Sequence, residues 1–157
     1  MIFENEEQEK TYKRIEPWIE EISSGLQCEK LEDIPEFRLQ LGSALAQTAV
    51  YPMGDEDSVI STRAYVVTGV DLTPDLMHFL LRENDRMTFG AFGIDQDGDI
   101  FFEHTIVGST CDKIELKTSL SSVVLIADEY DDLIVEKWGG KRAIDRGRAD
   151  EEEEATV

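Results

Sequence analysis

The sequence has few cysteines and few basic residues, and each shortage argues against a class of protein. Its two cysteines, Cys28 and Cys111, are too few and too far apart for a disulfide framework or a zinc site. Fifteen Lys and Arg residues face thirty-five Asp and Glu residues, which gives a net charge of −20 over 157 residues. Because no basic cluster interrupts this charge, neither nucleic acid nor an anionic membrane surface is expected as a partner.

Long apolar segments are also lacking. The longest apolar run, Val123 to Ala127, is far below the roughly 20 residues that a membrane-spanning helix needs. The first residues, Met1 to Glu7, have neither the basic flank nor the apolar stretch of a signal peptide. Together with two free thiols, these features predict a soluble protein of the reducing cytoplasm.

The apolar residues that are present suit one globular domain. They make up 41% of the chain, which is ordinary for a protein with a single core. We expect one α+β domain over residues 1–142, with an N-terminal helix at 4–25 and a sheet with helices at 36–140. The last segment, 143–157, contains five consecutive acidic residues and is predicted to be a disordered acidic tail.

Periodicity and turn signals give the order of the elements. Ile15, Ile19 and Ile22 recur at helical spacing in the first segment, where Pro17 either kinks one helix or begins a second. The remaining predicted elements are strands at 37–41, 43–51 and 58–68, a helix from Thr73-Pro74 to 84, a hairpin of 88–95 with 99–107 around Asp97-Gly98, and a helix at 112–138 capped by Thr110. This order predicts an antiparallel sheet with flanking helices in a layered α+β sandwich.

Two groups of acidic residues are candidate metal sites. The run Asp95 to Asp99 is similar to a calcium loop, but placing Gly98 at loop position six puts His104 where a bidentate carboxylate is required. We therefore interpret this run as a hairpin turn. Asp128, Asp131 and Asp132 lie at helical spacing and offer three carboxylates to a divalent cation, although a solvated helix face is the commoner meaning of such a group.

Nothing in the sequence predicts catalysis. The GxSxG and HExxH motifs are absent, and the two histidines, His78 and His104, belong to no recognisable nucleophile motif. A base and thiol pair of His104 with Cys111 is conceivable, but a structural histidine is more common. Gly139-Gly140-Lys141 follows a helix instead of preceding one, so it is not a phosphate loop. No enzyme activity, cofactor or metal is predicted.

Two predicted helices carry more apolar surface than packing against the core requires, and each of these surfaces favours protein binding. Trp18, Ile19 and Ile22 form an apolar face on a glutamate-rich helix and are the candidate partner-binding residues. The candidate homodimer interface is on the last helix and consists of Val124, Leu125, Ile126 and Leu133. Each surface has an alternative interpretation as ordinary core. If the first helix only covers the sheet, the client site is expected on an exposed strand edge.

Several segments, taken in order, resemble the YbjN family of bacterial proteins. They are GVDLTPDL at 69–76, FLLREN at 79–84, FGAFGI at 89–94 with DGDI at 97–100, ADEYDDLI at 127–134 and GGK at 139–141. The resemblance is strongest to the cyanobacterial and plastid branch. It implies the fold of type III secretion chaperones, which are small acidic proteins that usually form homodimers and hold an extended client segment.

From these observations we expect a non-enzymatic module, chaperone-like or regulatory, that forms a homodimer and binds an unknown client or regulatory protein. The alternative is a module that binds a small molecule or a divalent cation through its acidic helix face. Calcium or magnesium titration followed by melting temperature separates the two hypotheses, because a ligand that binds the native state raises that temperature.

Overall fold

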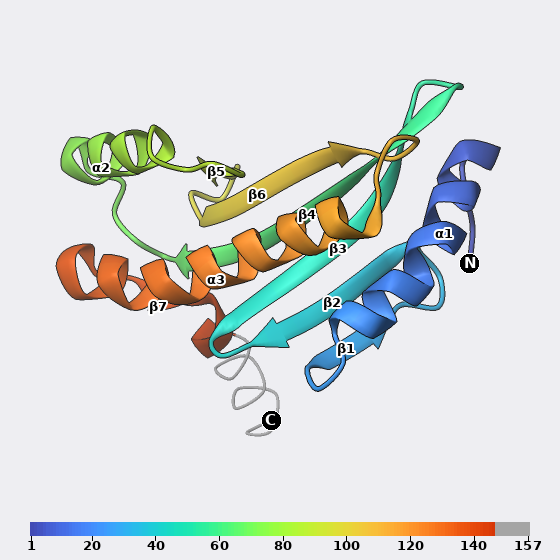
Figure 1. The fold of residues 1–157 in the computed structure, drawn as a ribbon. Helices are drawn as coiled ribbons and strands as arrows, with labels where there is room; N and C mark the ends of the chain where they lie inside the picture. Colours follow the sequence, from blue (N-terminus) through green and yellow to red (C-terminus); the bar gives the residue numbers. More distant parts are fainter. Residues whose placement is uncertain (147–157) are drawn as a thin grey trace, which may run out of the picture.

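The computed structural model describes residues 1–146 and has an α+β fold (Figure 1). Its elements are, in chain order, α1 (Glu6–Ile22), β1 (Gln27–Lys30), β2 (Glu36–Leu41), β3 (Ala44–Met53), β4 (Asp57–Thr68), α2 (Pro74–Asn84), β5 (Ala91–Ile94), β6 (Ile100–Val107), α3 (Lys113–Trp138) and β7 (Lys141–Arg142). Among these residues, no helix is both long and apolar enough to cross a bilayer.

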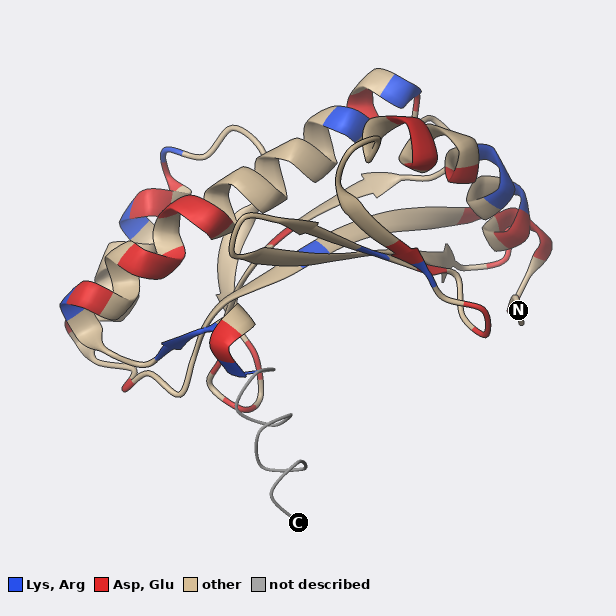
Figure 2. Cartoon of the chain, turned by 90° about the horizontal axis from the view of Figure 1, so that it is seen from below, with Lys and Arg blue, Asp and Glu red and all other residues tan. Residues whose placement is uncertain are grey.

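The strands form one antiparallel sheet in the order β1-β2-β3-β4-β6-β5, and β7 pairs with the end of β4. Both α1 and α3 lie on the same face of this sheet, and the chain's last described turn lies on the other side (Figures 1 and 2). The predicted antiparallel sheet with flanking helices is therefore confirmed.

The core lies between the sheet and the helices α1 and α3, and Leu76 and Leu80 of α2 add to it. Alternate residues of β4 point towards the helices and are fully buried, among them Ile60 and Ala64. An apolar stripe of α3 faces this core, with Leu116, Val123 and Ile134 all at 0% exposure. Such burial of alternating strand residues against a helix stripe is what fixes the sheet register.

Two helix boundaries differ from the prediction. The N-cap of α3 is Asp112, whose side chain accepts a hydrogen bond from the backbone N–H of Glu115, and the expected cap, Thr110, lies outside the helix. Helix α1 starts after Asn5, which caps the N–H of Gln8, and runs without interruption through Pro17. Asp112 lies two residues nearer the helix than Thr110, and its carboxylate is an equally good capping group, so it takes the capping role.

Three short elements were missed by the prediction. All four residues of β1 are exposed, so no alternation of polar and apolar residues marks it as a strand. Strand β7 has two residues, and a helical turn at 143–146 follows it, within the segment expected to be disordered. The rest of that predicted tail, 147–157, lies outside the described residues.

Candidate functional site

The sheet face opposite α1 and α3 carries a polar row that crosses five strands. The row consists of residues that are direct neighbours in the strand register: Glu29, Arg38, Gln47, Arg63 and Glu103. Arg63 Nε lies 2.5 Å from a carboxylate oxygen of Glu103, and its guanidinium group stacks over Phe101 at 3.8 Å from the ring centroid. Contacts between side chains therefore organise this face, which neither α1 nor α3 covers (Figure 2).

Apolar side chains lie on both sides of the polar row. On β3, Leu45 is 42% exposed and Tyr51 is 51% exposed, and Val107 of β6 is 40% exposed. Two adjoining hollows, of about 960 Å³ and 420 Å³, follow this face and share Gln47 and Tyr65 in their walls. They form one groove with apolar and charged walls, which is the usual composition of a binding surface for protein segments.

Three parts of the chain bound the larger hollow. Its floor comes from β2, β3 and β4, one side from the edge strand β1, and the far end from the hairpin turn at 95–99 and the C-terminal turn at 143–146. In the hairpin turn, Gly98 has a φ of +83° and Asp95 accepts hydrogen bonds from the N–H groups of Asp97 and Asp99. The hairpin turn predicted around Asp97-Gly98 is confirmed, and its glycine adopts a φ that other residues rarely take.

The two edges of the sheet differ in their hydrogen bonding. At the β5 edge, the Asn84 side chain accepts from the N–H of Phe92 at 2.7 Å and donates to its carbonyl at 3.2 Å. A side-chain amide thus takes the place of a neighbouring strand. This contact occupies the outward-pointing groups of Phe92 and so hinders the addition of another strand at β5, in the way that folded proteins protect exposed edges.

The β1 edge has no comparable cover among residues 1–146. The backbone bond from Leu31 N–H to Glu36 carbonyl fixes the ladder, so Gln27 and Glu29 bond to β2 while the N–H groups of Cys28 and Lys30 point outwards. Within the described residues, no backbone hydrogen bond reaches those two outward groups. The open edge lies directly beside the larger hollow, whose lining includes residues 26–29.

The predicted partner-binding residues of α1 do not all face solvent. Ile19 is fully buried in the cluster that contains Ile15 and Phe37, and Trp18 and Ile22 are half-buried against the same cluster. Of these three residues, only Trp18 and Ile22 have side-chain surface that a partner could contact in this conformation. Binding by this face stays a prediction.

The predicted dimer residues of α3 also divide into two groups. Val124 is 7% exposed and belongs to the core, and Ile126 is partly buried against it. Leu125 and Leu133 are 56% and 42% exposed, so they lie on the outer surface. A dimer contact through α3 would therefore use Leu125 and Leu133 with the exposed part of Ile126, and it too stays a prediction.

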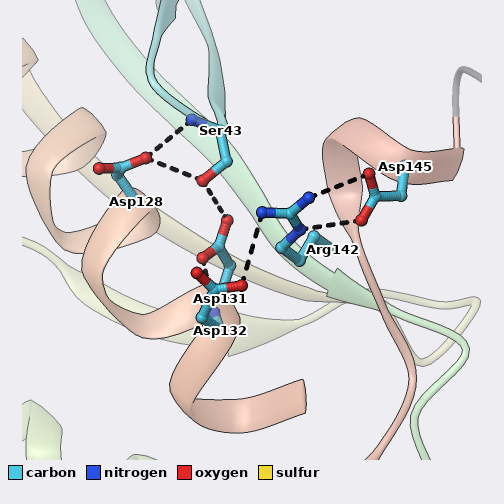
Figure 3. Close-up of polar contacts among 6 residues, drawn as sticks. All are labelled: Ser43, Asp128, Asp131, Asp132, Arg142 and Asp145. Carbon is cyan, nitrogen blue, oxygen red and sulfur yellow. Dashed lines mark hydrogen bonds and ion pairs between the residues drawn. The ribbon is translucent and has the colours of Figure 1, made fainter. Parts of the chain in front are cut away.

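The three aspartates of α3 that were candidate cation ligands make contacts within the protein instead (Figure 3). Asp128 and Asp131 both contact the Ser43 hydroxyl, at 2.8 and 2.6 Å, and Asp128 also accepts the Ser43 N–H. Asp132 pairs with Arg142 at 3.5 Å. Among residues 1–146 there is no group of His, Cys, Asp and Glu arranged to hold a metal ion. These carboxylates hold the β2–β3 turn and β7 against the helix.

The conceivable base and thiol pair has other contacts. His104 Nδ1 lies 2.8 Å from the Ser119 hydroxyl, beneath α3. Cys111 is 6% exposed, and its burial raises the pKa of the thiol to about 11, with Glu115 adding to the rise. A thiol with so high a pKa is almost entirely protonated at neutral pH and is a poor nucleophile. His78 is exposed on α2.

The open edge and its groove were not identified from the sequence. Exposure alternates over the first half of β3, but its sequence, ALAQTAVYPM, does not alternate between polar and apolar residues, so it does not show which face is left uncovered. The capping of Phe92 by Asn84 has no sequence signal, because it joins a helix end to a strand eight residues later. Pairing between distant elements, which decides what an edge can bind, is set by the tertiary structure.

Comparisons with known proteins agree with this architecture. The model of a protein family described as T3SS (YopN, CesT) and YbjN peptide-binding chaperone 1 matches residues 20–146. A chain in the structure of the HopA1–SchA chaperone–effector complex superposes with a TM-score of 0.57 at 9% identity, over 78% of this chain and 97% of the other. A chain of the ExsC–ExsE complex gives 0.56 at 15% identity, over 78% and 94%. No curated protein matches the sequence.

Proposed function

This chain belongs to the family of T3SS (YopN, CesT) and YbjN peptide-binding chaperones, and from that premise we propose that it holds an extended segment of a client protein on the open face of its sheet. The proposal makes it a protein-binding module without catalytic activity. The two similar solved structures are of a chaperone–effector complex and of the ExsC–ExsE complex, and they support the same fold for this chain.

The observation that carries the proposal is the contrast between the two sheet edges. Asn84 occupies the outward groups of Phe92 at the β5 edge, whereas the N–H groups of Cys28 and Lys30 at β1 are left to an external acceptor. An extended segment that pairs with β1 would satisfy these groups and continue the sheet by one strand. Backbone pairing of this kind supplies affinity with little demand on the client's sequence.

The groove then supplies selectivity. Side chains of an added strand alternate between the two faces, so every second one would lie over the larger hollow beside β1. Leu45 and Leu26 offer apolar contacts there, and Arg38 offers a charged one. We propose that the client segment presents apolar side chains at alternate positions.

Proline substitution tests the edge directly. Cys28→Pro removes an N–H that points outwards, so it should block strand addition and leave the pairing of β1 with β2 in place. Glu29→Pro is the matched control, because it removes an N–H that donates to Arg38 within the sheet. The ligand is a peptide of about twelve residues, long enough to form a strand, selected by phage display on the unmodified protein.

We expect Cys28→Pro to weaken binding of the selected peptide by roughly tenfold or more with the melting temperature nearly unchanged. Glu29→Pro should lower both the affinity and the melting temperature. In hydrogen–deuterium exchange, the peptide should protect residues 27–30 of the unmodified protein. Undiminished affinity of Cys28→Pro, or protection confined to α1, would place the client site elsewhere, and Trp18 and Ile22 would then be the next residues to test.

The remaining expectations stand as parts of the same proposal. They are a homodimer formed through Leu125, Ile126 and Leu133, residence in the cytoplasm, and descent from the cyanobacterial and plastid branch of the family. The alternative of a cation-binding module is disfavoured because the α3 carboxylates are engaged by Ser43 and Arg142. Magnesium or calcium that raises the melting temperature would revive it.

A further inference from the structure

One end of the client groove is closed by the chain's own C-terminal turn. Residues 143–146 follow β7, and Ala143 and Arg146 line the larger hollow from the side opposite β1. From there Arg146 Nη1 reaches an oxygen of Asp99, 2.7 Å away. The contact joins an element that the sequence predicts to be a disordered tail to the rigid hairpin of β5 and β6.

The two partners of this ion pair are held very differently. The Asp99 side chain is 8% exposed, and its other carboxylate oxygen accepts the backbone N–H of Gly69 at 3.1 Å. Its backbone is fixed by the hairpin turn, where Asp95 accepts its N–H. The Arg146 side chain is 58% exposed. The carboxylate is therefore positioned by the fold whether or not the arginine is present.

The turn that carries Arg146 is attached by few contacts. Strand β7 pairs with β4 at two positions, Val67 with Arg142 and Thr68 with Lys141. Arg142 of β7 also pairs with Asp132 of α3 and with Asp145 of the turn. Segments with so few contacts to the core open at a low cost in free energy compared with the sheet.

A carboxylate with so little exposure is largely cut off from water, so it needs hydrogen-bonding or cationic partners within its own surroundings. If the turn leaves the groove, Asp99 needs a replacement for the guanidinium group. Asp97, which is exposed in the same hairpin, adds a second negative charge to this end of the groove. A basic side chain on the client would meet both requirements.

We infer that Arg146 occupies a subsite for a basic side chain of the client, and that a client Arg or Lys displaces it and pairs with Asp99. This inference rests on the proposed function and names the chemistry of its ligand: a peptide with alternating apolar residues where it pairs with β1, and one basic residue in the part that crosses the groove towards Asp99. The C-terminal turn acts as an intramolecular competitor for that subsite.

Parallel peptide selections test the inference. Random phage-displayed peptides of about twelve residues are selected on the full chain, on Arg146→Ala, on Arg146→Ala with Asp99→Asn, and on Arg146→Ala with Asp97→Asn. The last two variants have the same net charge, so they separate a specific contact from the general attraction of an acidic protein for basic peptides. Asn at position 99 keeps an oxygen for the N–H of Gly69. Melting temperatures of all four proteins establish that they are folded.

We expect Arg or Lys at one fixed position in peptides selected on Arg146→Ala, and loss of this preference on adding Asp99→Asn but not Asp97→Asn. A synthetic peptide with that basic residue should bind Arg146→Ala about fivefold more tightly than the unmodified chain, and its Gln analogue should bind both equally. Selected peptides without a positional basic preference would overturn the inference and leave the proposed function standing. If no peptide could be selected on any one of the four proteins, both the inference and the proposed function would be overturned.

Discussion

The Ser43 hydroxyl oxygen lies 2.6 Å from Oδ2 of Asp131, a residue that is 2% exposed (Figure 3). The same oxygen lies 2.8 Å from Asp128. A serine hydroxyl has one hydrogen and can donate to one of these carboxyl groups only. The second contact becomes a hydrogen bond when Asp131 is protonated and donates to Ser43, which in turn donates to Asp128.

The surroundings of Asp131 favour that protonated form. Burial raises the pKa of its carboxyl group above the ordinary value, and Asp132 adds to the rise. Hydrogen bonds from Ser43 and from the Asp132 N–H, and the charge of Arg142, act in the opposite direction. Because the pKa is higher in the folded state than in the unfolded chain, Asp131 favours folding at low pH. That contribution is lost as pH rises from about 4 through the folded-state value.

Asp131→Asn should therefore stabilise the protein relative to the unmodified chain, and more so as pH rises. An asparagine can donate to Ser43 and accept the Asp132 N–H, so the network stays complete without a charge. We expect a gain in unfolding free energy on the order of 1 kcal/mol at neutral pH and little difference near pH 4. Urea unfolding at a series of pH values measures this. Asp132→Asn, at a largely exposed position, is the control for lost charge, and an equal effect of both variants would contradict the prediction.

Asn84→Ala should expose the β5 edge. The substitution removes both side-chain bonds to Phe92, and we expect a loss of about 1–3 kcal/mol in unfolding free energy. With its N–H uncovered, β5 should also pair between molecules, so the variant should form larger species in light scattering. Arg82→Ala, at an exposed position on the same helix, controls for loss of helix surface. A destabilised variant that remains a single small species would show that Asn84 stabilises without protecting the edge.

Gly98→Val should destabilise the hairpin of β5 and β6. The φ of +83° at this position is strained for any residue with a Cβ, and most of all for a β-branched one. Space is not the obstacle, since an added Cβ would lie 3.5 Å from Leu72. We expect a cost of about 1–2 kcal/mol, measured by thermal or urea unfolding, and a smaller cost for Gly98→Asn. Equal stability of the valine variant would contradict the φ assignment.

The sequence predicted those features that local chemistry determines. The Thr73-Pro74 helix start and the Asp97-Gly98 turn are each encoded within a few residues, and the structure confirms both of them. Their arrangement gives the fold class, because sequential strands with short turns pair as antiparallel neighbours. The resemblance to known segments added the family, which the match over residues 20–146 confirms.

The candidate site was not predictable in the same way. Strand β1 has four exposed residues and owes its existence to pairing with β2. The turn at 143–146 was hidden by the acidic composition that follows it, although Arg142 and Arg146 each have an acidic partner. Ile19 looked available for binding because helical spacing shows which residues share a face but not what that face meets.

The two cysteines should differ sharply in reactivity. Cys28 is exposed on β1, whereas burial raises the pKa of Cys111 to about 11. At neutral pH iodoacetamide should modify Cys28 alone, and mass spectrometry should show one adduct on the native protein and two after unfolding. Cys28→Ser should abolish the native adduct. Rapid native labelling of that variant would mean that Cys111 is activated and would reopen the thiol and His104 hypothesis.

The last prediction concerns the homodimer. If two copies meet through the exposed leucines of α3, then Leu125→Glu with Leu133→Glu should convert a dimer of the 17.8 kDa chain to a monomer in sedimentation. Glu129 and Asp132 lie exposed on the same helix, so like charges of the two copies would face each other. Added salt screens that repulsion, and the dimer should therefore strengthen as sodium chloride is raised.

A matched pair of substitutions on α2 separates this contact from another one. Met77 and Leu81 are 38% and 71% exposed at a spacing of one helical turn, so Met77→Glu with Leu81→Glu changes the charge equally on a different surface. Dissociation by the α3 pair alone supports the predicted interface. Dissociation by the α2 pair alone would move the interface to α2, where His78 and Arg82 flank the apolar residues and added salt should have a weaker effect. A monomer in the unmodified chain at micromolar concentration would remove the prediction altogether.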